Sequence, residues 1–254
     1  MKLEVRNLNY AYGEREILRD VSFSVRKGDF CAVLGANGVG KTTLFKCILG
    51  ILRDYRGKIR SDGTDLRTLS TREMARLIAY IPQVNHPTFG YSVLDTVLMG
   101  AAGQGSAFAQ PGKKQYAAAY AALERIGIAD FAARSFFHLS GGEQQLVLVA
   151  RALAQDSEIL IMDEPTASLD FGNQFRALEK VHALTEEGYT VLLSTHNPQH
   201  ALSFSNCLLA LKDGSVAAFG DTKTELTAEL IERLYSIRAR MVGCGGVSAV
   251  IPIV

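Results

Sequence analysis

The sequence predicts an α/β fold with a mostly parallel sheet, and the order of its apolar segments carries this prediction. Continuous apolar runs, which are typical of buried strands, lie at residues 30–34 and 159–162, and a further strand is expected at residues 189–193. Segments with helical periodicity follow two of these runs, at residues 41–49 and 173–187. Strands that alternate with helices are typical of a parallel sheet that helices cover on both faces.

Two further parts are expected around this core. The first residues alternate between apolar and polar side chains, as at residues 21–25, and this pattern predicts half-buried strands of an N-terminal antiparallel β subdomain. Residues 90–126 show helical periodicity that is broken by one Gly/Ala/Gln-rich loop at residues 101–112, with no strand pattern. We therefore expect an inserted α-helical subdomain at about residues 86–155.

Composition excludes some classes of function. The 254 residues carry 27 basic and 26 acidic side chains, a formal charge of +1, which predicts no nucleic-acid partner. We expect no secretory signal, and no apolar run reaches the roughly 18 residues that span a bilayer, so a membrane role requires a partner. The four cysteines, which are widely spaced in apolar stretches, are expected to be buried thiols and not metal ligands: Cys31, Cys47, Cys207 and Cys244.

A glycine-rich loop directly follows the first buried strand. Its sequence fits the pattern G-x-x-x-x-G-K-[ST], with Gly35, Ala36, Asn37, Gly38, Val39, Gly40, Lys41 and Thr42 in order. In such a loop, backbone amides surround phosphate oxygens at the start of a helix, the lysine reaches the β- and γ-phosphates, and the hydroxyl of Thr42 is offered to Mg²⁺. A purely structural glycine turn is the alternative, and the flanking strand and helix argue against it.

Polar residues with possible catalytic roles end two later strands. Asp163 and Glu164 follow residues 159–162, and successive side chains of a strand point apart, so one carboxylate can support Mg²⁺ while the other prepares a water molecule. His196 ends the next strand, where a neutral imidazole could donate to a γ-phosphate. Taken alone, the acid pair would be interpreted as solvated surface and His196 as a structural residue. The phosphate loop upstream favours the functional interpretation of both.

A second glycine turn precedes the helix expected from residue 143. Ser140 and Glu143 have the spacing of a capping box, which satisfies the amides of that helix itself. Gly141 and Gly142 at the same helix start could also form an anion site. Both interpretations remain open from the residues alone.

Taken together, these motifs resemble those of the nucleotide-binding subunit of an ATP-binding cassette (ABC) transporter. The motifs appear in the family's order: the loop at residues 35–42, Gln83, the turn at residues 139–143, the acids at 163–164, residues 168–170 and His196. The resemblance implies a P-loop NTPase (RecA-like) core in an ABC ATPase domain at residues 1–240. A C-terminal extension at residues 241–254 could add a terminal strand.

The resemblance also implies cofactors and residue roles. ATP and Mg²⁺ would be shared across a head-to-tail dimer, which we expect to contain two copies of this chain. Tyr12 would stack on adenine, Gln83 would contact Mg²⁺ and act as a hinge, Asp163 would support the metal, Glu164 would be the catalytic base, and His196 would hold the γ-phosphate. The phosphate contacts would come from the loop, Lys41, Thr42 and Thr43, and in trans from Ser140, Gly141, Gly142 and Glu143.

A finer resemblance points to a class of cargo. Residues 80–83, 91–100 and 169–174 are similar to those of importers of iron siderophores, haem, cobalamin and related metal chelates. It implies a polytopic transmembrane permease as partner, indirectly a substrate-binding protein, and a location at the cytoplasmic face of the cell membrane. A soluble cassette ATPase that acts as an iron–sulfur assembly scaffold is the alternative. In the family, the turn at residues 139–143 and the start of the helix after it form a signature motif. This chain departs from the commonest form of that motif at Glu143 and Leu146.

The phosphate loop yields a direct prediction. Lys41→Ala is expected to abolish ATP binding while the fold survives, because it removes one cation from the proposed phosphate site. Calorimetric titration with ATP measures the binding, and circular dichroism checks the fold. Unchanged affinity in a folded variant would reject the assignment of the loop.

Overall fold

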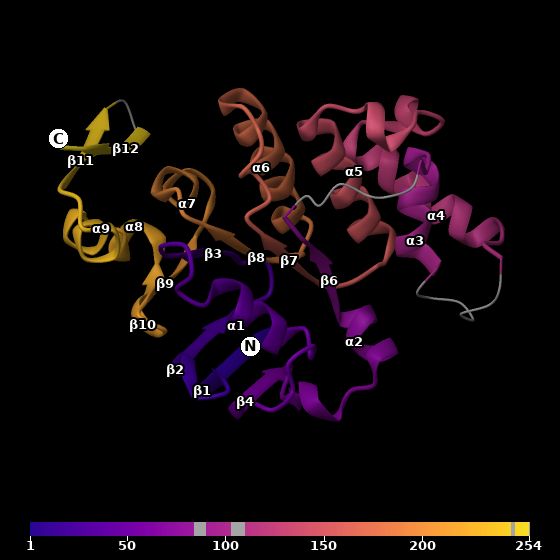
Figure 1. The fold of residues 1–254 in the computed structure, drawn as a ribbon. Coiled ribbons are helices and arrows are strands. Elements are labelled where there is room, and N and C mark those ends of the chain that lie inside the picture. The colour runs from indigo at the N-terminus through magenta and orange to yellow at the C-terminus, as the bar shows by residue number, and fades with distance from the viewer. Residues whose placement is uncertain (84–89, 103–109, 245–246, 254) are drawn as a thin grey trace. The chain divides into compact units, whose positions relative to one another are not determined.

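The computed structural model describes residues 1–83, 90–102, 110–244 and 247–253 (Figure 1). The chain divides into two compact units. The first unit contains Met1–Leu69 together with Thr185–Val254, and the second unit contains Ser70–Leu184. Within the described residues, no helix combines the length and the apolar character that crossing a bilayer demands.

An antiparallel sheet begins the first unit, as predicted. Its strand order is β2-β1-β4-β5. Alternate side chains of β2 are buried, including Val21, Phe23 and Val25, and Val5 of β1 pairs with Phe23. The alternation predicted from residues 21–25 thus reflects a sheet with one covered face. The strands are β1 (Leu3–Tyr12), β2 (Arg15–Val25), β4 (Arg56–Ser61) and β5 (Thr64–Asp65).

A second, mostly parallel group of strands in the first unit holds the phosphate loop. Its order is β10-β9-β3-β8, where β3 runs parallel to both β8 and β9, and β10 runs antiparallel to β9. Every residue of β3 and of β8 is buried, which explains their continuous apolar sequences. The strands are β3 (Phe30–Leu34), β8 (Thr190–Thr195), β9 (Cys207–Lys212) and β10 (Ser215–Asp221).

The helices of the first unit pack against these strands, and a hairpin of β11 and β12 follows them. A buried cluster that includes Ala32, Leu208 and Ile231 joins strands and helices, and Met241 and Val250 of the hairpin pack on it. The sequence suggested one terminal strand, whereas the structure forms two. The elements are α1 (Lys41–Ile48), the 3-10 helix η1 (Leu66–Thr68), α7 (Pro198–Phe204), α8 (Thr222–Glu225), α9 (Ala228–Tyr235), β11 (Ala239–Cys244) and β12 (Val247–Pro252).

The second unit combines two parallel strands with most of the helices. β6 pairs with β7, and Ile78 lies opposite Ile159. Helices α3, α4 and α5 pack against one another. A Cβ atom at Gly100 of α3 would overlap the Arg151 carbonyl oxygen of α5, so this close helix approach requires glycine. The elements are α2 (Thr71–Leu77), β6 (Ile78–Ile81), α3 (Val93–Ala102), α4 (Lys113–Ile126), the 3-10 helices η2 (Ala129–Phe131) and η3 (Phe136–His138), α5 (Gly141–Ala154), β7 (Ile159–Asp163) and α6 (Phe171–Glu186).

The predicted fold class is confirmed, with small differences at element ends. The helix expected from residue 143 begins at Gly141, because Ser140 caps it. Much of the predicted loop at residues 101–112 falls outside the described residues, which omit 103–109. Burial is confirmed for the thiols of Cys31, Cys47 and Cys207, whereas the side chain of Cys244 is outside the described set.

Candidate functional site

The phosphate loop connects buried β3 with α1, and its shape depends on glycine at several positions. Gly38 and Gly40 have φ angles of 80° and 113°, in the left-handed region that side chains disfavour. A Cβ atom at Gly35 would lie 2.6 Å from the Leu211 carbonyl oxygen. The pattern that identified this loop in the sequence therefore corresponds to real steric constraints on its backbone.

Lys41 and the start of α1 form a site of positive potential. Gly40 occupies the N-cap position and has no side chain with which to cap the helix, and the first turn of α1 contains no acidic residue. The buried Lys41 ammonium donates hydrogen bonds to the carbonyl oxygens of Gly35 (2.8 Å) and Ala36 (3.1 Å). Helix-end amides and a nearby lysine fit the phosphates of ATP. Residues 36–38 of the loop are exposed to solvent.

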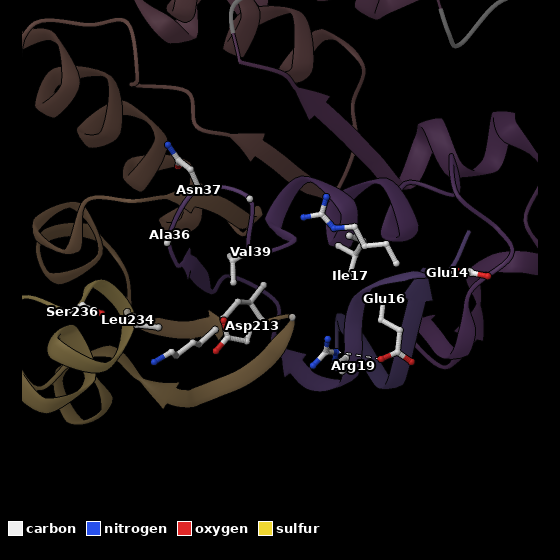
Figure 2. A pocket seen from close by; sticks show the side chains of 15 residues that line it. Glu14, Glu16, Ile17, Arg19, Ala36, Asn37, Val39, Asp213, Leu234 and Ser236 are labelled. Atoms are coloured by element: carbon white, nitrogen blue, oxygen red, sulfur yellow. Dashed lines mark ion pairs between the residues drawn. The ribbon is translucent and has the colours of Figure 1, made fainter. Parts of the chain in front are cut away.

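A cavity of about 850 Å³ lies beside this loop in the first unit. Figure 2 shows Ala36, Asn37 and Val39 of the loop along its wall, with Ile17 of β2 and Asp213 of the turn between β9 and β10. The lining is mixed in polarity and open to solvent. Space for the rest of a nucleotide is therefore available next to the loop.

The other residues assigned to nucleotide binding in the first unit differ in exposure. Tyr12 ends β1 with 47% of its surface exposed, and its ring meets Tyr10 edge to face at 5.0 Å between centroids. Thr42 is exposed in the first turn of α1, where a hydroxyl can reach a metal ion, whereas Thr43 is buried. Stacking of Tyr12 on adenine and a phosphate contact of Thr43 stay predictions.

His196 emerges at the same edge of the sheet as the phosphate loop. β3 and β8 are parallel neighbours, and Leu34 pairs with Thr195, so Gly35 and His196 are the next residues of adjacent strands. His196 is exposed, while Asn197 caps α7 by accepting a hydrogen bond from the Gln199 amide (2.9 Å). Strand register thus brings together two residues that the sequence separates widely.

Asp163 in the second unit has a partner that the sequence analysis missed. The carboxylate is buried at the end of β7, and the Tyr80 hydroxyl of β6 donates to its Oδ2 at 3.5 Å. Burial, and then the charge of Asp163, raises the pKa of Tyr80 to about 12, so the hydroxyl keeps its proton. The sequence offered one indication of this partner: Tyr80 lies in the strand just before Gln83, which is itself a candidate site residue.

Glu164 has an uncommon backbone conformation. Its φ angle is 45°, in the left-handed region that few residues other than glycine occupy. The residue is half-buried, and its carbonyl oxygen accepts a hydrogen bond from the Ala167 amide (3.2 Å). The chain therefore turns sharply at Glu164 and separates its side chain from that of Asp163. Backbone strain of this kind often accompanies a functional position.

The second glycine turn forms the predicted capping box. The Ser140 hydroxyl accepts from the Glu143 amide (3.4 Å), and the Glu143 carboxylate accepts from the Ser140 amide (2.7 Å). Hydrogen bonds from Ser140 hold the pKa of Glu143 below its ordinary value. The structural interpretation of this turn is therefore confirmed. Its contact with the nucleotide of a second copy stays a prediction.

The turn at residues 139–143 also packs against the loop that follows β7 and against the first turn of α6. A Cβ atom at Gly142 would lie 3.1 Å from the Asn173 side chain, and one at Gly141 would lie 3.3 Å from Leu169. Asp170 accepts hydrogen bonds from the backbone and side chain of Asn173, at 2.9 and 2.7 Å. Two motifs that are about 30 residues apart in sequence therefore form one surface within the second unit.

The remaining metal candidate, Gln83, is exposed directly after β6 and Pro82. The residues after it, 84–89, are outside the described part of the chain. Gln83, Thr42 and Asp163 offer an amide oxygen, a hydroxyl and a carboxylate. These oxygen donors are the kind that Mg²⁺ prefers, and Mg²⁺ completes its shell with water and substrate phosphates. The chemistry of each of these three side chains thus fits the ion.

Comparisons with known proteins identify relatives over most of the chain. Residues 18–167 match the family model described as ABC transporter. An uncharacterized ABC transporter ATP-binding protein of Haemophilus influenzae is 40% identical over 92% of this chain and 89% of its own. A Helicobacter pylori protein named as a probable iron chelatin transport ATP-binding protein is 38% identical, over 92% and 93% of the two chains.

A solved structure is also similar to this chain. An ABC transporter described as being of the metal-chelate type, in an inward-facing conformation, is similar with a TM-score of 0.87 and 33% identity. The likeness covers 99% of this chain and 96% of that one. It therefore includes the C-terminal part of the chain as well as the residues that the family model matches.

A buried histidine near His196 predicts a dependence of stability on pH. His200 is 4% exposed, and its Nε2 lies 3.1 Å from the Asn197 side-chain nitrogen. Burial, and then the charge of His196, lowers the pKa of His200 from 6.5 to about 4. The unfolded chain therefore takes up a proton at higher pH than the folded chain does. The free energy of unfolding falls as the pH drops from about 6.5 towards 4.

Urea unfolding at about pH 7.5 and about pH 5 measures this effect. We expect the His200 contribution to be a loss of about 2 kcal/mol over that interval. His200→Gln keeps a hydrogen-bond acceptor for Asn197 but does not titrate, so its stability should fall by correspondingly less. An equal loss in both proteins would show that His200 does not carry the pH dependence.

Proposed function

Because the chain belongs to the ABC transporter family, we propose that it energises an importer of a metal chelate: an iron siderophore, haem, cobalamin or a related compound. Its cassette hydrolyses ATP. The observation that supports ATP hydrolysis in this proposal is the phosphate loop, where the start of α1 has no side-chain cap and the Lys41 ammonium lies against the loop backbone. The names of the Helicobacter relative and of the similar transporter support the metal-chelate cargo.

We assign each part of the chemical step to a residue of the chain. The loop and Lys41 hold the triphosphate, and Thr42, Gln83 and Asp163 hold Mg²⁺. When bound, Mg²⁺ neutralises charge on the β- and γ-phosphates. Tyr80 fixes the Asp163 carboxylate through its hydroxyl. Glu164 orients the attacking water and accepts its proton, and His196 contacts the γ-phosphate beside the loop. Tyr12 stacks on adenine.

The nucleotide site is completed, in this proposal, by a second copy of the chain. Ser140, Gly141, Gly142 and Glu143 would close over the nucleotide of the partner, as in other cassettes of the family, which function as dimers with membrane permeases. The packing of Gly141 and Gly142 against residues 168–173 supports this role, because a single rigid surface could carry both motifs to the partner. Glu143 would act through its cap of α5.

The membrane connection is the finer part of the proposal. A polytopic permease would bind the chain at the cytoplasmic face of the cell membrane, and a substrate-binding protein would deliver the cargo to that permease. The ATPase domain would span residues 1–240 and would contain the helical subdomain at about residues 86–155. The C-terminal extension would follow it at residues 241–254. Gln83, between β6 and that subdomain, would transmit the movement. Helices α3, α4 and α5 pack together, as such a moving subdomain requires.

Extraction from native membranes tests the importer assignment. We expect the chain to co-purify tightly with a polytopic membrane protein, because the proposed cassette drives transport through a permease to which it binds. Uptake assays with siderophores, haem and cobalamin would then identify the cargo. Recovery with soluble partners alone would contradict the importer and favour the assembly scaffold.

A substitution at the proposed base tests the chemical step. Glu164→Gln is expected to bind ATP but to hydrolyse it at least about 100-fold more slowly, because the amide cannot accept the proton of the attacking water. Stalled dimers should accumulate with ATP on gel filtration. Glu124→Gln makes the same change at an exposed position of α4 and should leave turnover unchanged. Normal turnover in Glu164→Gln would remove Glu164 from this role.

A further inference from the structure

One side chain joins the C-terminal hairpin to the helix that follows His196. The Gln199 side chain of α7 accepts a hydrogen bond from the Val250 amide and donates one to the Ser248 carbonyl oxygen, both at 3.1 Å. Residues two apart on a strand direct their backbone groups to the same side. The Gln199 amide thus pairs with the free edge of β12 as the peptide group of another strand would.

Gln199 belongs to the same hydrogen-bonded turn as His196. The Asn197 amide donates to the Thr195 hydroxyl (3.0 Å), and the Asn197 side chain accepts from the Gln199 amide (2.9 Å). The Asn197 side chain also contacts His200. His196 lies inside this turn, so a displacement of α7 would displace the backbone that carries the imidazole.

The hairpin is well suited to hold α7 in place. Met241 and Val250 pack on the buried cluster of the first unit, and β12 contacts α7 directly. α7 has only 7 residues, and so short a helix depends on packing for its position. Its first turn is held from one side by the end of β8 and from the other by the edge of β12.

We propose that Gln199 is a positioning residue for hydrolysis, and that the C-terminal hairpin acts through it to hold His196 beside the phosphate loop. This inference rests on the proposed role of His196. Gln199 itself does not contact substrate in this account. The extension at residues 241–254 would therefore belong to the catalytic apparatus, although it lies outside the motifs that bind nucleotide.

Steady-state ATP hydrolysis by the full-length chain tests the proposal in a double-mutant cycle. Gln199→Met keeps the length of the side chain but cannot hydrogen-bond to β12. We expect kcat to fall about fivefold, because the two hydrogen bonds between Gln199 and β12 are lost, with KM for ATP nearly unchanged. In a His196→Ala background, the same substitution should have no further effect, because the group that it positions is gone.

Two further variants control for general effects on the fold. Ser203→Ala removes the other partner of the Gln199 nitrogen, at 3.1 Å, without affecting the hairpin, and should leave kcat unchanged. Val250→Pro removes the donor on β12 and should reproduce the loss seen in Gln199→Met, with no greater loss when the two are combined. Proline is tolerated at a strand edge where its nitrogen faces away from the neighbouring strand.

The outcomes separate the two claims. Unchanged kcat in a folded Gln199→Met variant, or a loss that multiplies with that of His196→Ala, would overturn the anchoring role and leave the rest of the site intact. Unchanged hydrolysis in His196→Ala would instead remove His196 from the site, and the anchoring role with it. We expect Gln199→Met to cause no further loss of kcat in the His196→Ala background. We also expect Ser203→Ala to leave kcat unchanged.

Discussion

The proposed function depends on the start of α1, where the N-cap residue Gly40 provides no side-chain cap. Gly40 precedes α1 and cannot satisfy the first amides of the helix, whereas Ser70, Ser140 and Thr227 cap α2, α5 and α9 with their hydroxyls. Uncapped amides and the helix dipole favour an anion, and Lys41 adds a full positive charge. In the proposed site, a triphosphate would accept hydrogen bonds from the amides that have no cap.

The order of the strands in the sheet determines which other residues lie beside the phosphate loop. Because β3 and β8 are adjacent and parallel, the loop after Leu34 and His196 after Thr195 begin at neighbouring points. The turn around His196 is in turn fixed by Asn197 and Gln199. Val250 is thereby connected through hydrogen bonds to Asn197, the residue that follows the proposed γ-phosphate contact His196.

Features encoded by local sequence could be predicted, and features that need strand register could not. The phosphate loop and the box of Ser140 and Glu143 depend on short patterns, and the structure forms both. The start of α5 was placed two residues late, since two glycines disfavour helix by propensity and the cap overrides them. The hydrogen bond from Tyr80 to Asp163 requires β6 to pair with β7, which no local pattern specifies.

Backbone amide shifts measured by NMR in the presence of Mg²⁺ and a non-hydrolysable ATP analogue test the central claim most directly. The account predicts that, for one copy of the chain, the largest changes occur at residues 36–43, because those amides bind the phosphates. The account would be contradicted if the amide shifts of residues 36–43 did not change and the largest shift changes occurred at the capped start of α5 instead.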